Sequence, residues 1–129
     1  MDEKRLSDVA ETAEEPLVFK LAHVGINTNS VEKSEHYASL LSKMFCVQPR
    51  AGNNSNFVSD MFEILKFPMR GTHGHIAMLT NSVTRAIEHL AAMGVEADMS
   101  TAKYREDGTL RFVYLKDEIC GFAFHLNLM

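Results

Sequence analysis

Histidine and carboxylate side chains recur in this sequence at places where they could meet in one metal site. His23 begins the run HVGINTNSV, and His75, 52 residues later, begins the similar run HIAMLTNSV. A repeat of this kind, with an identical TNSV and only two copies, indicates one domain built from two similar halves rather than a solenoid. Each half is expected to place a histidine in the middle of a strand.

Alternation along the expected strands adds two more candidates. Apolar residues flank each of four polar groups, which are His23, Glu63, His75 and His125. Because successive side chains of a strand point to opposite faces, we expect these four on one concave face and their apolar neighbours under helices. Imidazole and carboxylate together suit a divalent Zn, Ni, Mn or Fe ion. His73 lies on the same face as His75, and it either replaces His75 as a ligand or lines the cleft.

The elements that would position these groups follow the order β-α-β-β-β twice, which is an α+β design. A first helix is expected from a cap at Asn29 or Ser30 to about Phe45, and a second from a cap at Asn81 or Ser82 to Gly94. The inward stripe of the first helix is predicted to be Ser34, Tyr37, Ala38, Leu41, Met44 and Phe45. The expected strands are residues 17–28, 46–50, 56–59, 61–67, 72–80, 95–104, 110–116 and 119–128.

Charge and composition exclude several classes of function. The formal net charge is −4 over 129 residues, and residues 1–16 alone account for it, since they hold six acidic and two basic side chains. We therefore expect an acidic tail or linker at 1–16, a domain at 17–129, and no partner among nucleic acids. The absence of a long apolar run or signal segment favours a cytoplasmic protein that does not enter a membrane. Cys46 and Cys120 are expected to be free, buried thiols.

Four stretches of the chain resemble the vicinal oxygen chelate superfamily, which includes glyoxalases, dioxygenases and bleomycin-resistance proteins. They begin at Ala22 (AHVGI), Phe62 (FEIL), Gly74 (GHIA) and Gly121 (GFAFHL). The resemblance implies a glyoxalase-like fold in which modules 17–68 and 72–129 form one curved mixed sheet around a divalent metal ion. Its ligand positions correspond to His23, Glu63, His75 and His125. A homodimer is also implied.

The resemblance further implies lyase or isomerase chemistry on a small carbonyl or hydroxy-acid substrate through an enediolate. Glu63 or His125 would carry the proton, and Arg70, His73, Lys103 and Arg105 are candidates for binding a substrate carboxylate or phosphate. His125 stands where many members have a glutamate. Two alternatives remain, a small-molecule-binding module of the antibiotic-resistance type and an accessory domain. The accessory-domain alternative follows because residues 102–126 look like a domain found with 2-keto-3-deoxy-6-phosphogluconate aldolases. This resemblance implies that an aldolase is the partner.

Overall fold

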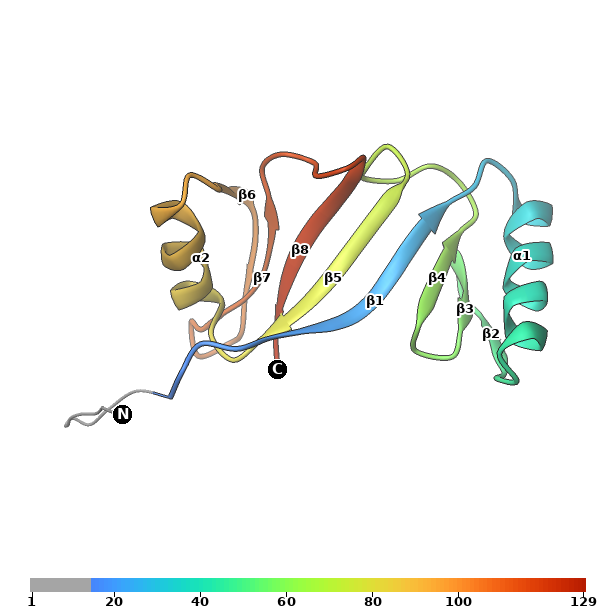
Figure 1. Ribbon diagram of the computed structural model, residues 1–129, viewed down its shortest axis with the longest axis horizontal. Helices are drawn as coiled ribbons and strands as arrows, with labels where there is room; N and C mark the ends of the chain where they lie inside the picture. Colours follow the sequence, from blue (N-terminus) through green and yellow to red (C-terminus); the bar gives the residue numbers. More distant parts are fainter. Residues whose placement is uncertain (1–14) are drawn as a thin grey trace.

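The computed structural model describes residues 15–129, which form one mixed sheet of eight strands with two helices (Figure 1). The first module contains β1 (Phe19–Asn27), α1 (Val31–Met44), β2 (Pro49–Ala51), β3 (Ser55–Val58) and β4 (Phe62–Leu65). The second contains β5 (Gly74–Thr80), α2 (Val83–Ala92), β6 (Ala97–Tyr104), β7 (Leu110–Leu115) and β8 (Phe122–Leu128). The predicted α+β class and the order β-α-β-β-β twice are confirmed. Residues 1–14 of the expected acidic tail lie outside the described part of the chain.

The order of the strands makes the two modules equivalent. The sheet runs β2-β3-β4-β1-β5-β8-β7-β6, with β1 parallel to β4 and β5 parallel to β8. The two modules join where β1 pairs antiparallel with β5. A pseudo-twofold axis therefore passes between β1 and β5, and Figure 1 shows α1 and α2 at opposite ends of the sheet, as this axis requires.

Both helices begin in the same way, because the repeat supplies matching N-caps. The hydroxyl of Ser30 accepts from the backbone N–H of Lys33, and that of Ser82 accepts from the N–H of Arg85. Such caps satisfy donors that the first helical turn leaves unpaired. The residue after the C-cap of each helix has a positive φ, at Cys46 with 58° and at Gly94 with 85°.

Replacing Cys46 by glycine is expected to stabilise the protein by about 0.5–1 kcal/mol, because the left-handed conformation strains every residue that has a Cβ. Gly94→Ala is the matched control. Its added Cβ meets nothing within 4 Å, so backbone strain alone should destabilise this variant by about 1 kcal/mol. Urea unfolding followed by circular dichroism measures both, and a loss of stability in Cys46→Gly would contradict the prediction.

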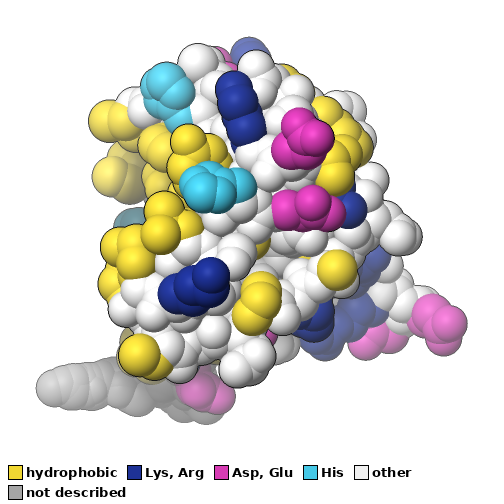
Figure 2. Space-filling view, turned by 90° about the vertical axis from the view of Figure 1, so that its right-hand side faces the viewer, with side chains coloured by type: hydrophobic (Ala, Val, Ile, Leu, Met, Phe, Trp, Pro, Cys, Tyr) yellow, Lys and Arg dark blue, Asp and Glu magenta, His cyan; other side chains and the backbone are white. Residues whose placement is uncertain are grey.

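The helices cover the convex face over two separate apolar clusters. Under α2, Val83 and Ala86 pack on Val113 and Leu126, and under α1, Ala38 packs on Val58 and Ile64. The predicted inward stripe of α1 is wrong in part. Tyr37, Met44 and Phe45 are exposed, while Ser42 is buried. Figure 2, which faces the end that carries α1, shows hydrophobic side chains gathered along one side of this surface.

A bulge at Ala22 interrupts the alternation of side chains along β1. Leu21 pairs with Met78 but His23 pairs with Ala77, so Ala22 is an extra residue. Because an inserted residue shifts the alternation, Phe19 and Leu21 lie on the helix side of the sheet and His23 lies on the other side. The ring of Phe19 accordingly lies 6.2 Å from that of His89 on α2. Regular alternation along the expected strand 17–28 predicts Phe19 and Leu21 on the face of His23, and the bulge shows that this prediction is wrong.

Two further details differ from the sequence predictions. Cys46 and Cys120 are free as predicted, but both are exposed rather than buried. The last strand begins at Phe122 rather than Ile119, because Cys120 and Gly121 both adopt positive φ and form a tight turn closed by Ile119 and Phe122. In the described part of the chain, neither helix is long and apolar enough to cross a membrane.

Candidate metal centre

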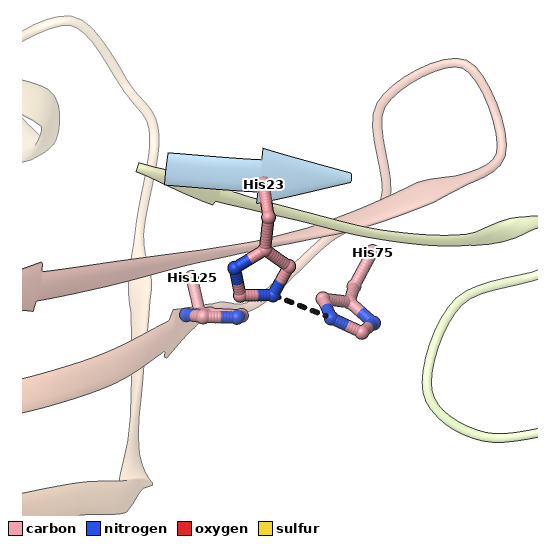
Figure 3. Close-up of side chains that lie close together, drawn as sticks. All are labelled: His23, His75 and His125. Carbon is pink, nitrogen blue, oxygen red and sulfur yellow. Dashed lines mark hydrogen bonds between the residues drawn. The ribbon is translucent and has the colours of Figure 1, made fainter. Parts of the chain in front are cut away.

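Three histidines from the middle of the sheet turn their rings toward one point on its concave face. Figure 3 shows His23 of β1, His75 of β5 and His125 of β8 pointing at each other. One nitrogen from each ring lies within 4.8 Å of those from the other two. The Nε2 atoms of His23 and His75 are 3.3 Å apart. Glu63 of β4 completes the group, with its Oε1 3.1 Å from Nε2 of His75 and 3.5 Å from Nε2 of His23.

Strand register explains why these four side chains meet. Gly25 pairs with both His75 and Glu63, and Ala77 pairs with both His23 and His125. Paired residues share a face of the sheet, so all of these groups lie on the concave face. The offset of 52 residues maps His23 to His75 and Gly25 to Ala77, and through these pairs it relates Glu63 to His125. The pseudo-twofold axis therefore maps the four side chains onto themselves.

The spacing of the donor atoms of His23, His75 and Glu63 fits one transition-metal ion. Ligand atoms about 2.1 Å from a shared ion, at tetrahedral or right angles, lie roughly 3.0–3.4 Å apart. The distances among His23, His75 and Glu63 are 3.1, 3.3 and 3.5 Å. Three imidazoles and one carboxylate favour Zn, Ni, Mn or Fe over Mg or Ca. All four groups come from one chain, so a site of this kind needs no second subunit to supply a ligand.

Glu63 and His125, which the pseudo-twofold axis relates, are each oriented by a further hydrogen bond. Ser55 donates its hydroxyl to Oε2 of Glu63 at 2.8 Å, which leaves Oε1 toward the histidines. Nδ1 of His125 lies 2.6 Å from Oδ1 of Asn127, so this nitrogen donates and Nε2 keeps its lone pair for the cluster. Such outer hydrogen bonds fix the tautomer and angle of metal-binding side chains.

The electrostatics keep both groups in the protonation state that binds a cation. Hydrogen bonds with His23 and His75 hold the pKa of Glu63 well below its usual range, although burial opposes this effect. Burial lowers the pKa of His125 to about 4, against the opposing hydrogen bond with Asn127, and the neighbouring His75 and His23 lower it further. Glu63 is therefore ionised and His125 neutral at neutral pH.

The lowered pKa of His125 predicts that the metal-free protein loses stability as pH falls from about 6.5 to about 4. In this pH window His125 is protonated in the unfolded chain but stays neutral in the folded chain, so a falling pH favours unfolding. The full effect is roughly 2–4 kcal/mol. Thermal unfolding in a chelating buffer at several pH values measures it. In His125→Gln this part of the acid sensitivity should vanish, and an unchanged slope would contradict the assignment.

Two aromatic rings of β7 form one wall of the site, and a cationic side chain stacks on each of them. Tyr114 and Phe112 lie 5.1 and 4.8 Å from the His125 ring, centroid to centroid. The guanidinium of Arg70 lies 4.2 Å from the Tyr114 ring, and the ammonium of Lys103 lies 4.8 Å from the Phe112 ring. Asn27 holds the loop that carries Arg70 through bonds to Met69 and Gly71. Arg70 and Lys103 therefore lie beside the aromatic wall of the cluster, and their role in binding a substrate anion stays a prediction.

The other two proposed substrate-binding residues lie elsewhere. His73 is exposed and sits before β5, with its ring 5.8 Å from Phe122, and it is not among the clustered histidines of the described chain. The positive φ of Gly74 at 145° ends the alternation that would have aligned His73 with His75. Arg105 donates to the backbone oxygen of Met129 at 3.3 Å, so it turns toward the end of the chain.

Sequence reasoning missed the residues that support the cluster. Asn127 could have been found, because it lies two residues after His125 and so shares its face. Ser55, Phe57 and Tyr114 could not, since their contacts depend on which strands pair and in which register. The sequence did not predict that Gly25 lies directly under the His75 ring.

The chain has a glyoxalase-like α+β fold, and its histidine cluster could hold a metal ion. Methylmalonyl-CoA epimerase from Mycobacterium tuberculosis superposes with a TM-score of 0.52 and 15% identity, over 84% of this chain and 86% of that one. A variant of the Streptomyces coelicolor methylmalonyl-CoA epimerase, in complex with 2-nitronate-propionyl-CoA, has a TM-score of 0.52 and 14% identity, over 84% of this chain and 93% of that one. A hypothetical protein from Bacillus halodurans C-125 has a TM-score of 0.55 and 15% identity, over 86% of this chain and 94% of that one. No family model and no curated protein matches the sequence.

Proposed function

We propose that this protein is a metal-dependent lyase or isomerase that acts on a small carbonyl or hydroxy-acid substrate. The observation that carries the proposal is the convergence of His23, His75, Glu63 and His125, with donor atoms 3.1–3.5 Å apart among the first three. The structural likeness to two methylmalonyl-CoA epimerases supports an isomerase. A bound divalent ion would supply the positive charge that stabilises an enediolate.

In this proposal the pseudo-equivalent residues Glu63 and His125 have different tasks. Both oxygens of Glu63 are engaged, one by the two histidines and the other by Ser55, so Glu63 acts as a fixed ligand. His125 is neutral and its Nδ1 is anchored to Asn127, so Nε2 carries its one available lone pair. In this proposal His23, His75 and Glu63 hold the ion, and the Nε2 lone pair of His125 takes a proton from the carbon next to the substrate carbonyl. Tyr114 and Phe112 would exclude water from one side of this proton transfer.

Purification without a metal-affinity tag, followed by elemental analysis, tests the metal part of the proposal. We expect about one Zn, Ni, Mn or Fe ion per chain. The loaded protein should then catalyse exchange of the proton next to the carbonyl of small 2-oxo acids for solvent deuterium, observed by NMR. His125→Gln should abolish most of this exchange. Metal binding with no exchange on any such acid would favour a binding module without turnover.

The proposed partners need separate tests. A homodimer is a prediction of family resemblance, and light scattering on the full chain checks it. The expected association with an aldolase is also a prediction, and copurification with a 2-keto-3-deoxy-6-phosphogluconate aldolase checks it.

A further inference from the structure

A cavity of about 260 Å³ opens beside His23, on the side of the cluster that faces β3 and β2. His23, Arg50, Phe57, Ser59 and Asp60 are among the residues that line it. His23 belongs to both the cavity and the histidine cluster. A molecule bound at the cluster can therefore extend into this cavity without crossing the sheet.

Arg50 supplies a cation on the same face as the cluster. Arg50 pairs with Phe57, and Phe57 pairs with Glu63, so the three side chains lie in one row on the concave face. The Arg50 guanidinium carbon lies 4.2 Å from the centre of the Phe57 ring. The backbone of Arg50 lies two strands from Glu63, but Phe57 belongs to the strand between them. Since neighbouring strands are about 4.8 Å apart, stacking on Phe57 holds the charge roughly one to two strand spacings from Glu63.

A second arginine stacks on an aromatic ring in the other half of the sheet, but it comes from the loop between β4 and β5, so the pseudo-symmetry does not relate it to Arg50. Tyr114 pairs with His125 as Phe57 pairs with Glu63, and Arg70 stacks on Tyr114 at the same 4.2 Å. Arg70, however, is neutralised by Asp98, whose Oδ2 lies 3.2 Å from its Nη2. Among the residues that the structure describes, no carboxylate forms an ion pair with Arg50, and the exposed Asp60 at the cavity rim does not reach it.

We propose that Arg50 forms an anion subsite, and that the substrate is a small dicarboxylic acid. Its 2-oxo or 2-hydroxy acid head would lie at the histidine cluster, and its second carboxylate would lie at Arg50. The strand spacing allows about three to five carbon atoms between the two anionic ends. This inference rests on the proposed metal-dependent function, and it names the class of substrate for that site.

Binding to the cobalt-loaded protein tests the proposal without relying on turnover. The matched probes are 2-oxoglutarate and 2-oxopentanoate, which have the same head and chain length but differ in the distal carboxylate. Each is titrated while the cobalt absorption bands are recorded. We expect 2-oxoglutarate to bind at least about tenfold more tightly, because an arginine–carboxylate hydrogen bond is charge-assisted. Arg50→Gln should abolish this difference and leave the cobalt content and the affinity for 2-oxopentanoate within about twofold.

Two variants serve as controls. Arg111→Gln removes an exposed arginine of β7, so it repeats the change in net charge, and it should retain the preference for 2-oxoglutarate. Asp60→Asn should strengthen 2-oxoglutarate binding, because it removes the carboxylate at the rim. If both acids shift the cobalt bands with equal affinity, or if Arg50→Gln leaves the preference intact, the subsite is overturned while the metal site stands. If cobalt does not bind and neither acid binds, the proposed function falls with it.

Discussion

Replacing Gly25 by alanine is expected to destroy metal binding while the sheet stays folded. A Cβ at this position would lie 2.1 Å from Cε1 and 2.6 Å from Nε2 of His75. No real contact is that short, so the His75 ring must rotate out of the cluster. Gly25 is not among the glycines with positive φ, so the backbone itself accepts alanine. We expect metal affinity to fall at least about 100-fold, with a stability cost of about 1–3 kcal/mol.

The pseudo-symmetry provides the control for Gly25→Ala. Ala77 is the equivalent residue, and it already carries a methyl group opposite His23. Ala77→Gly removes that methyl from a fully buried site and should cost about 1 kcal/mol of stability, while metal affinity changes only a few-fold. Competition with a chromophoric chelator measures affinity, and circular dichroism confirms folding. Wild-type affinity in Gly25→Ala would show that His75 does not bind the metal from its observed position.

Replacing His75 by alanine is expected to reduce metal affinity by roughly 100- to 1,000-fold, because each ligand contributes a large share of the total binding free energy. His75 is 7% exposed, and its Nε2 lies within 3.3 Å of both His23 and Glu63. A metal at 100 times its dissociation constant stabilises the folded wild-type protein by about 2.7 kcal/mol. The corresponding increase in melting temperature should be absent in His75→Ala.

Exposed histidines on the two helices serve as controls for His75→Ala. His36 lies on α1 and His89 on α2, both are exposed, and neither belongs to the histidine cluster. Alanine at either position should therefore leave metal content and the melting shift unchanged. Mixing His23→Ala with His75→Ala should not restore binding, because the four clustered side chains come from one chain. Restored metal binding in the mixture would show that the site forms between chains instead.

The sequence alone determined the architecture and the four central side chains. The repeat at His23 and His75 predicted two equivalent modules, since residues that recur at a fixed period occupy equivalent places in a duplicated fold. Alternation then predicted that Glu63 and His125 lie on the same face as His23 and His75, because side chains along a regular strand point to the two faces in turn. Both helix starts were narrowed to two residues by local capping chemistry, and in each case the serine is the cap.

Only the tertiary structure decided what surrounds these four groups. The bulge at Ala22 moved Phe19 and Leu21 to the other face, and the turn at Gly74 removed His73 from the cluster, because both depend on how neighbouring strands pair. The contrast between Arg70, neutralised by Asp98, and Arg50, which has no such partner, also depends on strand pairing. Local sequence fixes the direction of a side chain within its own strand, whereas register between distant strands fixes which side chains become neighbours.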